Sequence, residues 1–423
     1  MTTPRSPMRL LLRDFGYTGG IETTNIHLVR EFTQQVELLV WVMPRSRFDY
    51  FQQFLPPTDR LIYATDAWPR KSRLQEKLAS GARHLHRQKN VPARFASRGL
   101  RQALSDMRLK RLIREHKITH CLWSWILHVD PPRVAVPLGA MVMDIRWRHL
   151  PETFCGCDVN SIERQFCRWL KRSDIVFPVS DVTAADVKRF YPWYTGPIRV
   201  VPHAAREPGS NGKAIAPLEL PPGRPFFYYP AIAHAHKNHL TLFDACAKLF
   251  AKGYDFDLVL TGAETEHFDY TQPNDEEAIE PGRALLRKEE AFIRGRVKPL
   301  GYCGRPEVQA LYEQCTAVVL PSFFEGFGLT LTEALEYGAE IICSDIPAHR
   351  EQLTRYECTD SVSVIPPNDP TAWAVEMEKV LLASRNGASQ KSSAPPRLER
   401  WTWKDAAAAY VESLSALRAD RAP

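Results

Sequence analysis

Short apolar runs alternate with segments of helical periodicity along most of this 423-residue chain, and they do so in two series. The first series begins with "MRLLLRDF" (8–15). The second begins with "PFFYYP" (225–230), after a stretch at 206–223 that is rich in Pro, Gly and small residues. Strands that alternate with helices in this way form parallel sheets covered by helices on both faces. The pattern therefore predicts an α/β protein with two doubly wound domains.

Each series contains six apolar runs that have the length of buried strands. They lie at 8–15, 36–43, 119–125, 139–145, 173–180 and 197–203 in the first series, and at 225–230, 256–262, 296–301, 317–322, 340–345 and 361–367 in the second. We expect a Rossmann-like domain at 1–207, a linker at 208–223 and a second Rossmann-like domain at 224–398. A last helical segment at 399–423 is expected to return to the first domain.

The composition is that of a soluble globular protein, with 44% hydrophobic and 25% charged residues. The sequence has no apolar run that approaches the ~18 residues of a membrane-spanning helix. Its N-terminus lacks the apolar stretch and the small-residue cleavage site of a signal peptide. The nine cysteines are scattered, which suits reduced thiols better than disulfides or zinc. We therefore expect a cytoplasmic protein.

The positive charge is concentrated in one segment of the chain. Residues 66–117 contain fifteen Lys and Arg against four Asp and Glu, a net of +11, whereas the whole chain carries +6. Within this segment, 73–89 has the pattern of a basic amphipathic helix, which could lie on an anionic membrane surface, hold a polyanion or simply present a solvated face. Nucleic acid is disfavoured as a partner because no base-reading motif accompanies the charge.

Two glutamates eight positions apart mark the most informative stretch, "PSFFEGFGLTLTEALEYGAE" (321–340). The pattern predicts a strand, a glycine loop that holds Glu325, and a helix that holds Glu333 near its start. Gly326 and Gly328 would let a ligand approach the backbone closely. Two carboxylates here could each accept hydrogen bonds from vicinal hydroxyls, one pair on a ribose and one on a sugar, which indicates a sugar nucleotide. The alternative is a charged loop followed by a solvated helix face.

Two other strand-to-helix loops bear on this hypothesis. Gly16, Gly19 and Gly20 could cradle a phosphate or shape an acceptor pocket, but they do not complete the G-x-G-x-x-G pattern of a nicotinamide site. Lys237 follows the strand at 225–230, where its charge could meet a diphosphate.

Two possible metal motifs are disfavoured. The histidines around the lysine, His234, His236 and His239, could form a metal cluster, but no carboxylate or cysteine accompanies them and the lysine would repel a metal ion. The D-x-D motif of Asp255 and Asp257 precedes its strand, on the wrong edge of the sheet for a ligand.

The motifs of the second half occur in the order and spacing found in one known family. They are "HKNH" (236–239), "LVLTG" (258–262), "PLGYC" (299–303), "LYEQC" (311–315), "PSFFEGFGLTLTEAL" (321–335) and "CSDIPAHRE" (343–351). Weaker matches in the first half are "GG" (19–20), "MDIRWRHLPETF" (143–154), "FPVSDVTAADV" (177–187) and "VVPHA" (200–204). Over nearly its whole length the chain resembles the retaining glycosyltransferases of family 4.

This resemblance implies a GT-B fold, with two Rossmann-like domains facing across a deep cleft. It also implies transfer of a hexose from a nucleoside diphosphate sugar to a glycan or lipid-linked acceptor, without a metal or other cofactor. Lys237 would bind the diphosphate, Glu325 the sugar hydroxyls and Glu333 the ribose. Lys237 and Glu325 are the expected catalytic residues. The other expected donor-binding residues are Gly19, Gly20, Gly262, Gly326, Phe327, Gly328 and Leu329.

The chain departs from the family pattern at two places. Ile232 stands where an arginine is frequent, so His236 or Arg305 is expected to share the phosphate charge. The frequent His-Asp pair is Met143 and Asp144 here, so His149 or His128 is a candidate replacement for the histidine. We expect Asp144, His149 and Ser180 to contact the acceptor or the sugar.

The form of the lysine loop looks most like that of transferases using GDP-mannose or a related deoxyhexose. We expect front-face attack, in which the departing phosphate accepts the proton of the acceptor. The basic segment at 66–117 suggests an acceptor on the cytoplasmic face of a membrane. Two rival functions are a sugar-nucleotide 2-epimerase on the same fold and a non-catalytic protein that binds a membrane or a polyanion through 66–117.

Overall fold

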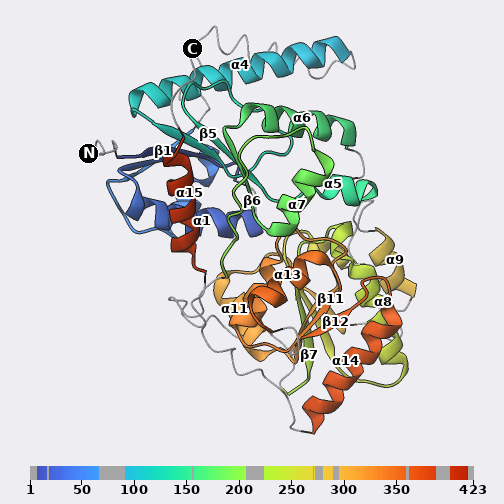
Figure 1. The fold of residues 1–423 in the computed structure, drawn as a ribbon. Helices are drawn as coiled ribbons and strands as arrows, with labels where there is room; N and C mark the ends of the chain where they lie inside the picture. The colour runs from blue at the N-terminus through green and yellow to red at the C-terminus, as the bar shows by residue number, and fades with distance from the viewer. Residues whose placement is uncertain are drawn as a thin grey trace.

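The computed structural model of the chain contains two parallel α/β domains, one above the other in Figure 1. It describes residues 7–16, 19–65, 91–154, 157–205, 223–269, 271, 280–288, 295–358, 362–386 and 401–417. The predicted basic helix at 73–89 and most of the expected linker lie outside the described residues. The basic segment is therefore described only at 91–117, most of which forms one long helix.

The first domain is built on a six-stranded parallel sheet with the order β3-β2-β1-β4-β5-β6. Its strands are β1 (Arg9–Arg13), β2 (Leu38–Val42), β3 (Leu61–Ala64), β4 (His120–Trp123), β5 (Leu138–Val142) and β6 (Ile175–Pro178). Its helices are α1 (Gly20–Gln35), α2 (Phe48–Gln52), α4 (Val91–Glu115), α5 (Arg146–His149), α6 (Val159–Arg172) and α7 (Asp181–Phe190). Alternate residues of β1 and β2 enter two separate apolar clusters, so both faces of this sheet are buried.

The second domain repeats the same topology in the order β12-β11-β10-β7-β8-β9. Its strands are β7 (Phe226–Pro230), β8 (Asp257–Thr261), β9 (Val297–Pro299), β10 (Ala317–Leu320), β11 (Ile341–Ser344) and β12 (Ser363–Ile365). Its helices are α8 (His239–Ala251), α9 (Glu280–Lys288), α11 (Arg305–Gln314), α12 (Leu329–Glu336), α13 (Pro347–Arg355) and α14 (Pro370–Arg385). In each sheet the order reverses between the two central strands, and ligands of such folds bind at that point, beyond the carboxyl ends.

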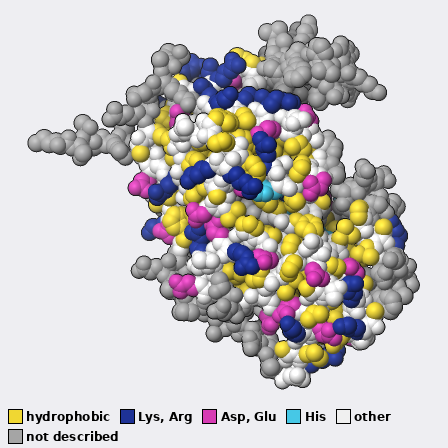
Figure 2. All heavy atoms as spheres, turned by 45° about the vertical axis from the view of Figure 1, so that its right-hand side comes forward, with side chains coloured by type: hydrophobic (Ala, Val, Ile, Leu, Met, Phe, Trp, Pro, Cys, Tyr) yellow, Lys and Arg dark blue, Asp and Glu magenta, His cyan; other side chains and the backbone are white. Residues whose placement is uncertain are grey.

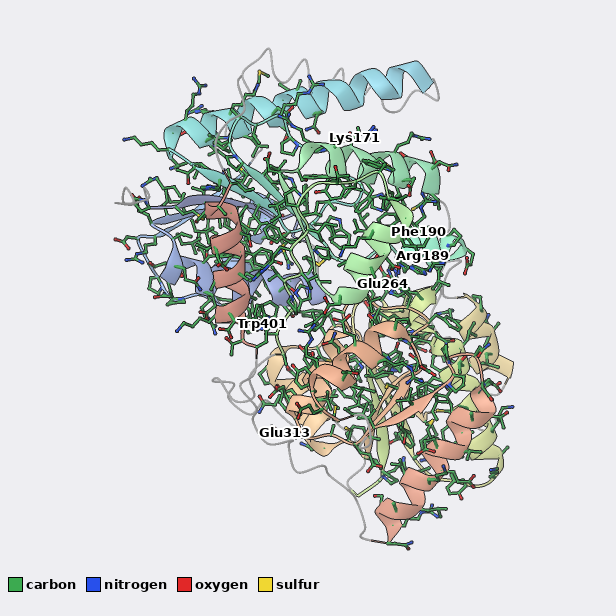
Figure 3. All side chains as sticks on the ribbon, viewed as in Figure 1. Lys171, Arg189, Phe190, Glu264, Glu313 and Trp401 are labelled. Atoms are coloured by element: carbon green, nitrogen blue, oxygen red, sulfur yellow. The ribbon has the colours of Figure 1, made fainter. Side chains whose placement is uncertain are left out.

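The chain returns to the first domain at its C-terminal end. Helix α15 (Trp403–Ser415) packs beside α1 in Figure 1, and Tyr410 and Leu414 are buried in the first domain's core. The indole nitrogen of Trp401 donates to the Pro202 carbonyl at 2.8 Å, and Figure 3 shows this side chain beside the domain boundary. The far end of the chain therefore stabilises the first sheet.

One strand prediction is wrong, and one strand was missed. The run at 197–203 forms only an isolated bridge between Ile198 and Val176. It contains Pro197 and Pro202, and a proline has no N–H to donate to a sheet. In contrast, β3 was not predicted, because a four-residue edge strand carries little periodicity.

Candidate active site

Lys237 and Glu325 meet at the centre of the second sheet's carboxyl edge. Lys237 ends the short η3 helix (Ala235–Lys237) after β7, and Glu325 lies in the loop after β10, the neighbouring strand. The lysine Nζ donates to Glu325 Oε1 at 2.6 Å, and the Ser322 hydroxyl donates to the same oxygen at 2.7 Å. Both charged side chains are nearly buried, with 14% and 13% of their surfaces exposed. The two residues predicted to be catalytic thus form one ion pair.

The carboxyl of Glu325 is ionised despite its burial. Burial alone would raise its pKa, but the charges of Lys237 and His349 and the hydrogen bonds from Lys237 and Ser322 hold the pKa below its ordinary value. The site therefore presents a fixed carboxylate beside a fixed ammonium group.

Asn238 fixes the backbone of the lysine loop. It adopts the left-handed conformation at φ 58°, and its side chain accepts from the Thr241 amide to cap α8. Its amide nitrogen donates to the Pro321 carbonyl at 2.9 Å and to the Pro367 carbonyl at 2.6 Å. Tyr229 also donates to the Lys237 carbonyl at 2.6 Å. These contacts join the lysine loop to the loops that follow β10 and β12.

The glycine loop before α12 lies directly against the first domain. A side chain at Gly326 would place its Cβ only 1.9 Å from the Met143 carbonyl oxygen, so this close approach requires glycine. Gly328 precedes α12 at φ 93°, a conformation that also favours glycine. The Ser180 and Thr183 hydroxyls donate to the Gly326 carbonyl at 2.6 and 3.1 Å. Ser180, a predicted sugar or acceptor contact, therefore binds the glycine loop itself.

The other predicted residues of this loop also face the first domain. The ring of Phe327 lies 5.3 Å from that of His203. Leu329 packs against the first domain's core, and a Cβ at Gly20 would lie 3.4 Å from its side chain. Gly19, at φ 91°, precedes α1 on this same side. The structure therefore brings Gly20 to the glycine loop, whereas a Cβ at Gly19 would meet nothing within 4 Å.

Two further donor-site predictions concern the second domain. Glu333 is buried on α12, where the Tyr312 hydroxyl donates to its Oε2 at 3.3 Å. Gly262 lies behind the lysine loop, since a Cβ there would come within 2.6 Å of the Ala231 carbonyl carbon. The geometry gives Gly262 a packing role in support of that loop. Arg305 begins α11, and its side chain lies outside the described part of the molecule.

The first domain contributes Asp144 and His149. A Cβ on Gly326 would lie 3.0 Å from the Cβ of Asp144, so Asp144 is next to the glycine loop. His149 Nε2 is paired with Asp186 Oδ2 at 2.7 Å, and its ring lies 5.0 Å from that of Phe324, the neighbour of Glu325. His128 has a φ of 61°, and burial lowers its pKa.

Residues of both possible metal motifs are engaged with other partners in the structure, and His234 lies 3.8 Å from the Glu264 carboxylate. His239 is buried between the rings of Tyr229 and Phe268, and burial lowers its pKa to about 3. Asp257 begins β8 at the amino edge of the sheet and is paired with Arg224 and Arg296. Within the described ranges no group of three or more His, Cys, Asp or Glu could hold a metal ion.

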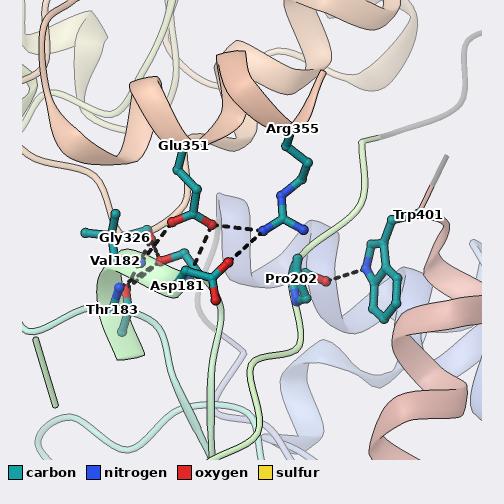
Figure 4. Close-up of polar contacts among 9 residues, drawn as sticks. Asp181, Val182, Thr183, Pro202, Gly326, Glu351, Arg355 and Trp401 are labelled. Carbon is teal, nitrogen blue, oxygen red and sulfur yellow. Dashed lines mark hydrogen bonds and ion pairs between the residues drawn. The ribbon is translucent and has the colours of Figure 1, made fainter. Parts of the chain in front are cut away.

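Sequence reasoning missed a set of contacts that join the two domains (Figure 4). The Glu351 carboxylate of α13 accepts from the backbone amides of Asp181 and Val182 at the start of α7, at 3.1 and 2.9 Å. A carboxylate is favoured at a helix N-terminus by the free amides and the helix dipole. Arg355 bridges Glu351 and Asp181 at 3.0 and 3.3 Å. Glu351 stands at the end of the quoted "CSDIPAHRE" motif, but only the fold shows its partner.

Comparison with known proteins identifies the second domain. Residues 211–394 match the family model described as "Glycosyl transferases group 1". This range includes Lys237, Glu325 and Glu333. The domain that holds the ion pair is therefore a glycosyl transferase group 1 domain.

Curated relatives match shorter parts of the chain. O-antigen chain mannosyltransferase B from Escherichia coli is 35% identical over 84 residues, which are 20% of this chain and 21% of that protein. D-inositol 3-phosphate glycosyltransferase from Corynebacterium urealyticum is 23% identical over 290 residues, which are 64% of this chain and 65% of that protein. The chain thus spans less than two thirds of the length of either relative.

The likeness in fold covers nearly the whole chain. Sucrose-phosphate synthase from Thermosynechococcus elongatus superposes with a TM-score of 0.65 at 16% identity, over 96% of this chain and 98% of that one. The predicted GT-B fold, with its two Rossmann-like domains, is thereby confirmed. The family match and the fold thus agree, with a glycosyl transferase group 1 domain inside a GT-B fold.

Because Lys237 and Glu325 form a buried ion pair, we expect Lys237→Met to lower the free energy of unfolding by an amount that depends on pH. Without the lysine, burial raises the pKa of Glu325 above its value in the unfolded chain, so the folded state binds a proton more tightly. The variant should lose about 3–5 kcal/mol at pH 7, and the loss should shrink as the pH falls through the raised pKa toward 5. Urea unfolding of both proteins at the two pH values measures this.

The double variant Lys237→Met/Glu325→Gln is the control for this prediction, because its neutral side chain has no proton to gain. The dependence of the stability loss on pH should be absent in the double variant. An equal loss for Lys237→Met at pH 7 and pH 5 would contradict the assigned cause.

Proposed function

We propose that this protein is a retaining glycosyltransferase that moves a hexose from a nucleoside diphosphate sugar to a glycan or lipid-linked saccharide. The observation that carries the proposal is the buried pair of Lys237 and Glu325, at the strand reversal of a glycosyl transferase group 1 domain. A cation and a carboxylate side by side suit a ligand that has both phosphates and vicinal hydroxyls. Glu333, on the helix after Glu325, is suited to the ribose.

In this proposal Lys237 and Glu325 bind different parts of the donor. The diphosphate attracts Lys237, which stabilises the charge that grows on the leaving group. The Glu325 carboxylate accepts hydrogen bonds from the sugar. We favour front-face attack because hydrogen bonds and a lowered pKa make Glu325 a poor nucleophile. Lys237 supplies positive charge at the diphosphate, so we propose a mechanism without a divalent metal or other cofactor.

The donor and the acceptor belong to the same proposal. A hexose such as mannose or a related deoxyhexose, carried by GDP, is our preferred donor, and the likeness to an O-antigen chain mannosyltransferase supports it. A lipopolysaccharide-type or other lipid-linked glycan is the preferred acceptor. Such an acceptor requires the enzyme to work at the cytoplasmic face of a membrane.

Helix α4 supports a peripheral membrane contact. It lies at the end of the first domain remote from the second domain, and Figure 2 shows Lys and Arg gathered there. Lys110, Arg111 and Arg114 are exposed on it, whereas Leu109 and Leu112 are buried in the domain core. None of the helices that the structure describes is both long and apolar enough to cross a membrane. A basic face of this kind binds anionic lipid head groups.

The test of the proposal is a thermal-shift panel of nucleoside diphosphates and their sugar conjugates. A ligand that binds only the folded state raises the melting temperature. One nucleotide should stabilise the wild type and lose its effect in Glu333→Ala. The matched control Glu336→Ala, three residues further along α12, should keep the shift. If no nucleotide stabilises the wild type, the proposed donor site is wrong.

Assays of donor turnover distinguish the glycosyltransferase from the two rival functions. Conversion of the sugar nucleotide to an isomer without any acceptor would favour a 2-epimerase. Nucleotide binding without turnover in the presence of membrane extract would favour a binding protein.

The membrane proposal predicts salt-sensitive binding to vesicles that contain anionic lipid. The triple variant Lys110→Gln/Arg111→Gln/Arg114→Gln should bind at least about tenfold more weakly, because each cation near such a surface contributes about 1 kcal/mol. The triple variant Lys248→Gln/Lys252→Gln/Lys379→Gln, on the second domain, removes the same charge and should bind normally. Equal binding by the two triple variants would refute the assignment to α4.

A further inference from the structure

Arg146 projects from the first domain into the active site of the second. It is the first residue of α5, after β5, and its backbone amide donates to Asp144 Oδ1 at 2.9 Å. Its guanidinium carbon lies 4.5 Å from the centroid of the Phe154 ring. One guanidinium nitrogen, Nη1, is hydrogen-bonded to Nδ1 of His236, the residue next to Lys237. Arg146 therefore crosses the domain boundary at the lysine loop.

The hydrogen bond to His236 brings no negative charge to Arg146. Burial, followed by the charges of Lys237 and Arg146, lowers the pKa of His236 well below its ordinary value, so the ring is neutral. Because a guanidinium only donates, the neutral ring accepts the bond at Nδ1. Among the described residues no partner bonds to the buried Nε of Arg146. The guanidinium thus remains charged, and its buried Nε–H group is available to donate a hydrogen bond to a ligand.

The charged groups around the lysine loop suit the binding of a diphosphate. Glu325, the carboxylate nearest to the lysine loop, is already bound by Lys237 and Ser322. That ion pair has no net charge, whereas a diphosphate carries several negative charges. The charges of Asp144 and Glu325 both act on Arg146, but within the described residues Asp144 accepts a hydrogen bond only from the backbone amide of Arg146. A planar guanidinium can bind two phosphate oxygens at once, which an ammonium group cannot.

We propose that Arg146 is a further catalytic residue that binds the diphosphate of the donor from the first domain, opposite Lys237. This inference rests on the proposed function. When the bond between the sugar carbon and the phosphate oxygen breaks, the electron pair stays on that oxygen, and Arg146 and Lys237 share the developing charge. The acceptor oxygen forms the new bond to the sugar, and its proton passes to the departing phosphate.

Catalysis by both cations depends on the contact between the domains. Lys237 and Glu325 belong to the second domain and Arg146 to the first, so both cations reach one diphosphate only when the domains are together. The bonds from Ser180 and Thr183 to the Gly326 carbonyl hold that arrangement. Donor bound to the second domain alone would lack the second cation and hydrolyse slowly.

The test compares nucleotides that differ by one phosphate. Calorimetry would give the Kd of the wild type, Arg146→Gln and Arg146→Lys for the stabilising nucleoside diphosphate and for its monophosphate. The ratio of the monophosphate Kd to the diphosphate Kd should fall about tenfold or more in Arg146→Gln. Arg146→Lys should restore part of the ratio. Arg148→Gln is the matched control, because Arg148 pairs with Glu163 away from the site.

Each outcome decides the proposal. An unchanged ratio in Arg146→Gln would overturn it, even if both affinities fell together. If Arg146→Gln does not fold, as judged by circular dichroism, the ratio in Arg146→Lys decides instead. If the wild type binds no nucleotide, the proposed function fails together with this inference. If the wild type binds and Glu333→Ala does not, while the Arg146 variants keep the wild-type ratio, only the role of Arg146 is wrong.

Discussion

The ion pair of Lys237 and Glu325 is the interaction on which the candidate active site depends. Taking two charges out of water costs several kcal/mol, and their attraction offsets this cost only when the geometry is fixed and the remaining polar atoms are satisfied. Both conditions are met here. Asn238 and Tyr229 fix the lysine loop, and Ser322 donates to the same carboxylate oxygen as the lysine. The pair therefore stays charged in a buried position, ready for a ligand with charges and hydroxyls of its own.

The two sheets place this pair where a second domain can complete the site. Each sheet reverses its strand order at the centre, and the loops beyond β7 and β10 meet at that reversal. The first domain then approaches so closely that Gly326 has no room for a side chain. Glu351 and Arg355 of the second domain form hydrogen bonds with the start of α7 in the first domain. Contacts between the domains thus determine the geometry of the glycine loop that holds Gly326 and Gly328.

Sequence reasoning predicted what depends on local pattern. The buried parallel strands appear as continuous apolar runs, so both domains and the positions of Lys237, Glu325 and Glu333 after their strands could be predicted. Contacts across the domain boundary could not, because they join residues that are 90 or more positions apart in the sequence. The Ser180 hydroxyl, expected to contact the acceptor or the sugar, also donates to the Gly326 carbonyl, and Gly262 packs behind the lysine loop. Arg146 lay within a quoted motif, yet only the fold shows that it reaches His236.

The measurement that tests the central claim most directly is the turnover of the preferred sugar nucleotide by Lys237→Ala and Glu325→Gln. The claim is that this pair is the catalytic centre. Loss of one electrostatic contact to the transition state predicts a fall of about 10²-fold or more in kcat for each variant. Lys248→Ala, on the exposed side of α8, should keep the wild-type rate. Full turnover by Glu325→Gln, in a protein that folds normally, would contradict the claim.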